Sequence, residues 1–159
     1  MVTMTTMNKA FSLLELSIVL VIIGLIAGGI VAGSSMIRAA ELRSVITEYQ
    51  QYQTAVHTFR DKYLGLPGDL KNATAFWGAA HATPATCLTT VGTGTQTCNG
   101  NGDGILDDSA NASEYGERFT FWQHLANADL ANGTFTGIAG PGAINNAIID
   151  ENIPSSKLL

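Results

Sequence analysis

A glycine-rich segment in the second half of the chain carries oxygen side chains at the spacing of a calcium-binding loop. Side-chain oxygens stand at alternate positions from Asn99, and Gly104 follows the third of them. Such a loop holds calcium when its first, third and fifth residues converge across a sharp glycine turn. The predicted ligands are Asn99, Asn101, Asp103, the backbone carbonyl of Ile105 and Asp107.

The end of this segment departs from the calcium pattern. Ala110 stands at the twelfth position, where a bidentate acid completes such loops. Glu114 or Glu117, slightly further on, would then have to complete the shell. The alternative is a turn rich in glycine and asparagine that binds no ion. Because two of the ligands are Asn rather than Asp, we expect the affinity to be modest, of the extracellular class.

The two cysteines of the chain, Cys87 and Cys98, stand just before this segment. A redox or nucleophilic role would require a neighbouring histidine or a C-x-x-C arrangement, and neither is evident. We therefore predict a structural disulfide between them. In the chain-entropy model a loop of this size would stabilise the domain by roughly 2–3 kcal/mol. Such a bond persists outside the reducing cytoplasm.

Other functional classes find little support in the residues. His57, His81 and His124 are scattered, with no H-E-x-x-H spacing and no nucleophile elbow, so we predict no enzyme. We expect His57 and His124 to be packing or surface residues. The net charge of −5 argues against nucleic acid as a partner, because a nucleic-acid-binding domain normally shows a basic patch.

A charge-free segment near the N-terminus predicts a membrane helix. Leu16–Ile37 contains no ionisable residue and would span roughly 33 Å as a helix, close to the hydrocarbon core of about 30 Å. A secretory signal peptide is the alternative, but its apolar region is shorter, about 7–15 residues, and follows a basic stretch. Here only Lys9 precedes the segment as a basic residue. We therefore predict a retained helix.

Two features of this helix suggest that it packs against other helices. Glu15 stands at its start, and a carboxylate in an apolar helix is costly enough to indicate a function with a partner. The alternative places Glu15 within one turn of the membrane surface, where water solvates it. Gly24 and Gly28 put small residues on one face, as do Gly29 and Gly33, although glycine is common in membrane helices generally.

The residues from Lys9 to Leu16, which read KAFSLLEL, give these features a common context. They resemble the class III signal of type IV pilins and type II secretion pseudopilins. The resemblance implies that a prepilin peptidase cuts between Ala10 and Phe11 and methylates Phe11 as the new N-terminal residue. It also implies that Glu15 pairs with the amine of its own or a neighbouring chain. Ala10 departs mildly from the pattern, in which glycine is commoner at this position.

The same resemblance implies a fold, a location and partners. The fold is α+β and pilin-like: a long N-terminal helix, half transmembrane and half amphipathic, packs on a small C-terminal domain. Such a domain normally supplies an antiparallel sheet, whereas the residues of this chain predict a loop-rich domain with little sheet. The protein is expected in the bacterial inner membrane as a single-pass protein with its C-terminal domain outside the cytoplasm, and then in a pilus or pseudopilus. Its partners would be copies of itself, other pilin-like subunits, the peptidase and the assembly platform. Calcium sites recur in this superfamily. The alternative is an unprocessed single-pass membrane protein whose outer domain binds calcium or another ligand.

The predicted organisation has four parts: a cleaved leader (1–10), a transmembrane and assembly helix (11–37), its amphipathic continuation (38–64) and a globular domain (65–159). Apolar residues recur at helical spacing through the continuation and predict a stripe that packs on the chain's own domain. The stripe consists of Leu42, Val45, Ile46, Tyr49, Tyr52, Val56, Phe59 and Tyr63.

Within the globular domain, Asp69 is a predicted N-cap for a short helix that extends to Trp77. Residues 83–97 predict an irregular loop or hairpin, and residues 114–130 predict a helix. Alternation of apolar and polar residues with a period of two, which indicates a β-strand, is scarce, so we expect little sheet. The chain ends on Lys157-Leu158-Leu159 without a terminating signal. This predicts either an incomplete reading frame that lacks further strands or a natural C-terminus that ends on leucines.

Overall fold

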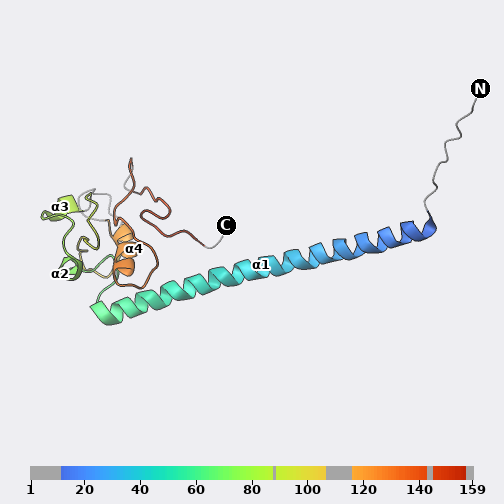
Figure 1. Cartoon of the computed structure of the whole chain (residues 1–159). Coiled ribbons are helices and arrows are strands. Elements are labelled where there is room, and N and C mark those ends of the chain that lie inside the picture. Colours follow the sequence, from blue (N-terminus) through green and yellow to red (C-terminus); the bar gives the residue numbers. More distant parts are fainter. Residues whose placement is uncertain (1–11, 88, 107–115, 143–144, 157–159) are drawn as a thin grey trace, which may run out of the picture. The chain divides into compact units, whose positions relative to one another are not determined.

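A computed structural model of the chain describes residues 12–87, 89–106, 116–142 and 145–156 (Figure 1). The helices in these ranges are α1 (Leu13–Tyr63), α2 (Ala73–Trp77), α3 (Pro84–Cys87) and α4 (Glu117–Asn127). The chain divides into two compact units, the first up to Ser44 and the second from Val45 onward. Helix α1 therefore supplies all of the described helical residues of the first unit and the first element of the second.

The described part of the first unit contains the apolar part of α1, and it confirms the prediction of a long N-terminal helix. By length and composition this helix could cross a membrane. Its large apolar side chains, from Leu13 to Ile37, are exposed in the chain on its own. Hydration of a continuous apolar surface of this size is unfavourable in water.

The core of the second unit forms where the last turns of α1 meet α2 and α4. Ala55 and Phe59 are the buried residues of α1. They form one cluster with apolar residues of the following segments, Leu70, Ala73, Leu125 and Ala128. Burial of these side chains against one another holds the second unit together, at about 25 cal/mol for each Å² of apolar surface removed from water.

The predicted apolar stripe of residues 42–63 is only partly the packed face. Three of its residues contribute to the core or pack against it, as predicted: Val56, Phe59 and Tyr63. Ala55, which was not part of the predicted stripe, also belongs to the core. Leu42, Ile46 and Tyr49 are exposed instead. The difference arises because the stripe is wider than one helix–domain contact, so residues at its edge remain uncovered in the chain on its own.

The short helix after the Leu66-Pro67-Gly68-Asp69 turn begins later than predicted. Helix α2 starts at Ala73, and its N-cap residue is Asn72, which makes no side-chain capping bond. The prediction of Asp69 as the N-cap was therefore wrong. The side chain of Asn99 supplies the cap instead, since its Oδ1 accepts the backbone N–H of Thr74 at 2.8 Å. Asp69 is engaged elsewhere, as described below.

The described part of the second unit contains little strand pairing, as the sequence predicted. Two isolated bridges join Ala79 to Thr97 and Ile149 to Ile153. The predicted loop or hairpin of residues 83–97 contains the short helix α3, and the predicted helix over residues 114–130 appears as α4. Its first two predicted residues, 114 and 115, lie outside the described ranges. The fold is thus a long helix followed by a small, loop-rich part.

Near the C-terminal end, a side chain rather than strand pairing satisfies the hydrogen-bonding groups of the backbone. Asn152 is almost completely buried, and its Oδ1 accepts the backbone N–H of Ile148 at 2.7 Å. Its Nδ2 donates to the carbonyls of Ile138 and Asn146 at 3.0 and 2.9 Å. One amide side chain therefore satisfies three backbone groups of two loop segments, which would otherwise be costly to bury.

Candidate functional site

The start of α1 places Glu15 in a reciprocal cap with Ser12. The backbone N–H of Ser12 donates to Glu15 Oε2 at 2.9 Å, and Ser12 Oγ accepts the backbone N–H of Leu14 at 3.3 Å. This is a capping box, in which the carboxylate also lies favourably at the positive end of the helix dipole. The S-x-x-E spacing in the sequence carries this signal, and our sequence reasoning missed it. The predicted processing residues, Ala10 and Phe11, lie outside the described residues.

The two glycines predicted to mediate helix packing are open on all sides. A Cβ atom added at Gly24 or Gly28 would have no neighbour within 4 Å. Nothing in the chain itself therefore requires glycine at these positions. Their role in packing against another helix stays a prediction.

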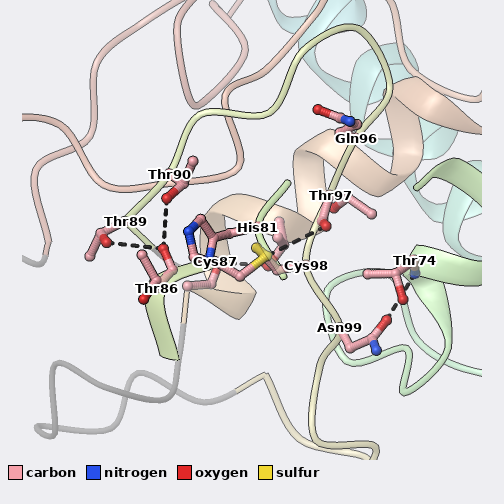
Figure 2. The surroundings of a disulfide bond; sticks show 12 residues. Thr74, His81, Thr86, Cys87, Thr89, Thr90, Gln96, Thr97, Cys98 and Asn99 are labelled. Carbon is pink, nitrogen blue, oxygen red and sulfur yellow. Dashed lines mark hydrogen bonds between the residues drawn. A yellow bond between two sulfur atoms is a disulfide. The ribbon is translucent and has the colours of Figure 1, made fainter. Parts of the chain in front are cut away.

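The two cysteines form the predicted disulfide (Figure 2). Cys87, in α3, is joined to Cys98 with an S–S distance of 2.07 Å and a Cα–Cα distance of 5.8 Å. Both residues are buried. The polypeptide around the bond is tied down further, because Thr89 Oγ1 and Thr90 Oγ1 both donate to the carbonyl of Thr86, at 3.1 and 2.8 Å. The disulfide is thus part of a compact, hydrogen-bonded loop, as expected of a structural bond.

The glycine-rich segment after Cys98 is held by a carboxylate that is distant in the sequence. Asp69, only 4% exposed, accepts the backbone N–H groups of Gly102, Asp103 and Gly104. The bonds from Asp103 and Gly104 measure 3.2 and 2.9 Å. Successive backbone N–H groups that converge in this way form a nest for an anion. The nest is filled by a side chain of the protein itself.

A second buried carboxylate holds the same segment from α4. Glu117 is 1% exposed, and its Oε1 accepts the backbone N–H of Asn101 at 2.9 Å. From the sequence Glu117 was a candidate calcium ligand, whereas in the structure it binds the backbone of the loop. The neighbouring Gly68 allows the close approach of these elements. Its φ is +89°, and an added Cβ would collide with the carbonyl oxygen of Glu117.

The predicted calcium ligands are only partly brought together. Asn99 turns away to cap α2, while Asn101 and Asp103 lie close enough for Asn101 Nδ2 to donate to Asp103 Oδ2 at 3.1 Å. Asn101 Oδ1 and Asp103 Oδ1 each accept a backbone N–H two residues further on. Among the described residues no group of three His, Cys, Asp or Glu side chains could hold a metal ion. Asp107 lies outside the described residues.

Calcium binding therefore stays a prediction, and a thermal melt tests it. Calcium at 10 mM, compared with a chelator, should stabilise the second unit by roughly 1.4–2.7 kcal/mol if the affinity is of the extracellular class, about 10⁻⁴–10⁻³ M. Asp103→Ala should abolish the increase, and magnesium at the same concentration serves as the control. If calcium leaves the melting temperature of the wild-type chain unchanged, the segment does not bind calcium.

The buried side chain of His124 is the centre of a polar network that sequence reasoning missed. Gly68 N–H donates to its Nδ1, and its Nε2 lies 3.0 Å from Thr97 Oγ1. Thr97 Oγ1 in turn donates to Gln123 Oε1 at 2.6 Å. The sequence predicted that His124 is either a packing or a surface residue, and its burial confirms the first of these alternatives. The network joins α4 to the turn after α1 and to the disulfide loop.

Comparisons with family models, with curated proteins and with solved structures gave no match.

Proposed function

We propose that the chain is a prepilin-like structural subunit. A prepilin peptidase would process it between Ala10 and Phe11, and it would assemble through its N-terminal helix into a type IV pilus or a type II secretion pseudopilus. The observation that carries this proposal is the order Lys9-Ala10-Phe11-Ser12-Leu13-Leu14-Glu15 directly before a charge-free helix. The residue types, their spacing and the apolar run that follows all match the prepilin signal.

The start of α1 supports the proposal in chemical terms. Cleavage would create an ammonium group on Phe11, the residue before the helix cap at Ser12. The bond from Ser12 occupies one oxygen of the Glu15 carboxylate, and the other is the natural partner for an ammonium group of the same or a neighbouring chain. Neutralising both charges in this way lowers the cost of keeping them in an apolar assembly of helices.

The rest of the chain is consistent with a subunit that is anchored first and assembled later. The apolar helix could cross a membrane, and its exposed surface requires lipid before assembly and neighbouring helices after it. The buried disulfide favours a location outside the reducing cytoplasm for the second unit. On this proposal the partners are copies of the chain, related subunits and the assembly platform, in the inner membrane.

Co-expression with a prepilin peptidase tests the proposal. Intact mass of the purified chain should show loss of residues 1–10 and gain of one methyl group, with fragmentation placing the methyl on the amine of Phe11. A catalytically inactive peptidase is the matched control and should leave the full-length mass. An uncleaved chain with the active enzyme would contradict the proposal and would favour an unprocessed single-pass membrane protein with a ligand-binding outer domain.

A further inference from the structure

His124 is the most enclosed titratable side chain among the described residues. It is 0% exposed and lies beside two aromatic rings, one from α1 and one from α2. The ring of Phe59 is parallel to it within 1° at a centroid distance of 6.2 Å, and the ring of Trp77 lies at 5.3 Å. The imidazole therefore fills a place in the apolar core, although both of its nitrogens need polar partners.

The hydrogen bonds around the ring specify its protonation state. Gly68 N–H donates to Nδ1 at 2.9 Å, so Nδ1 carries a lone pair and not a proton. The proton is then on Nε2, which donates to Thr97 Oγ1 at 3.0 Å, with the carbonyl of Cys98 at 3.3 Å. The neutral ring is thus fully satisfied and connects three segments of the second unit.

Among the described residues, few charged side chains lie on the elements around the ring to compensate for an added proton. On α1, next to Phe59, the side chains of His57, Arg60 and Asp61 are exposed. Asp69, beside Gly68, binds the amides of residues 102–104, and Glu117 on α4 binds the amide of Asn101. Helix α2 and residues 97–98 contribute no charge, and Arg118, also on α4, carries a positive one. The hydrogen-bond and ring partners described above for His124 are all uncharged.

We propose that His124 is an acid-sensitive latch, whose protonation releases the Gly68 turn and the Thr97–Cys98 end of the disulfide loop from α4. A proton on Nδ1 would place a second donor against the Gly68 N–H, and a backbone amide cannot change from donor to acceptor. The ring would also carry a charge beside Phe59 and Trp77 at a position that is 0% exposed to solvent. The contact with Gly68 must therefore break before the ring accepts a proton.

The direction of the pH effect follows from the burial of the ring. Burial lowers the pKa of His124 to about 4, a change that the carbonyl of Cys98 opposes. In the released state the pKa returns to about 6.5. The closed state is therefore fully favoured above pH 6.5 and loses stability as the pH falls from 6.5 towards 4. Between pH 7.5 and pH 5.0 the equilibrium constant for opening should rise by about 20–30-fold.

Release at Gly68 has a further consequence in the neighbouring loop. Asp69, the next residue, holds the amides of Gly102, Asp103 and Gly104, so movement of the turn loosens this nest as well. The disulfide stays closed, and Leu125 and Ala55 still belong to the apolar core. We therefore expect the loops to open locally while the apolar core between the helices stays packed.

Amide hydrogen exchange of the full chain in detergent micelles tests the latch, after correction for the intrinsic pH dependence of exchange. The amides of Gly68 and Gly104 should show the 20–30-fold rise in opening between pH 7.5 and pH 5.0, while those of Ala55 and Phe59 should change less. His124→Gln is the matched variant, because its amide can accept from Gly68 or donate to Thr97 but does not titrate, and it should remove the rise. His57→Gln, at an exposed position, should keep it.

Nitrogen-15 NMR of the imidazole ring in the wild-type chain gives a readout that does not depend on the variant's folding. It should show a neutral ring protonated at Nε2 at pH 7 and a titration midpoint near 4. An exchange profile that is flat with pH, the same rise in His124→Gln, or a ring that titrates near its ordinary value would each overturn the latch.

Discussion

Asp69→Ala is expected to lower the free energy of unfolding of the second unit by about 3 kcal/mol. The carboxylate accepts three backbone N–H groups, and charge-assisted bonds of this kind contribute roughly 1.5–3 kcal/mol each when they are buried. The sum is reduced here because Gly102 and Gly104 are exposed, so water can reach their amides once the loop moves. Denaturant unfolding in the presence of a chelator, followed by tryptophan fluorescence, measures the change.

Two matched variants show whether the loss comes from the buried position. Asp103→Ala removes an exposed carboxylate of the same loop, which accepts one backbone N–H, from Ile105, and should cost about 1 kcal/mol or less. Asp69→Asn keeps the shape and one acceptor oxygen but places an NH₂ group against a backbone donor, so its cost should be intermediate. Equal losses for Asp69→Ala and Asp103→Ala would show that the nest does not anchor the loop.

Glu15→Ala is expected to abolish filament assembly while insertion and cleavage continue. If the proposed function is correct, the variant leaves the ammonium group of Phe11 without an anion among apolar helices, and an unpaired buried charge is strongly unfavourable. Recovery of sheared filaments, compared with the amount of processed chain in the membrane, measures assembly. Normal incorporation of the variant would count against charge pairing.

Because Glu15 also caps the helix, two further variants are needed to separate charge pairing from helix capping. Glu15→Gln can still accept the N–H of Ser12, because glutamine also serves at this position of a capping box, but it carries no charge. Ser12→Ala keeps the carboxylate and removes only the bond to Leu14. If pairing with the amine is essential, Glu15→Gln should fail to assemble and Ser12→Ala should assemble. The opposite result would assign Glu15 to helix capping alone.

Local features of this fold could be predicted from the sequence because their causes are local. The apolar run gave the long helix, the scarcity of alternation gave the near absence of strands, and a single pair of cysteines left one disulfide to form. The cap at Ser12 was equally local and was readable from its spacing. It was missed because Glu15 was considered as the partner of an amine or as an acid at the membrane surface, and not in relation to Ser12.

The contacts around the glycine-rich loop could not be predicted in this way. Asp69 binds amides more than thirty positions further along the chain, and Gly68 meets His124 across 56 positions. No periodicity or motif links residues that far apart, since only the packing of α1, α2 and α4 brings them together. The sequence therefore indicated a calcium loop from the spacing of its own oxygens. It gave no sign that two distant carboxylates already bind the loop's backbone.

The near absence of strands matters for a chain proposed to stand among many copies of itself. Proteins with long edge strands must guard against edge-to-edge aggregation, because unpaired N–H and C=O groups in a row invite another chain. The described residues of the second unit offer only isolated bridges, and side chains such as Asp69 and Asn152 satisfy the backbone between them. Within the described residues, these units therefore present no long edge strand on which another chain could add at high local concentration.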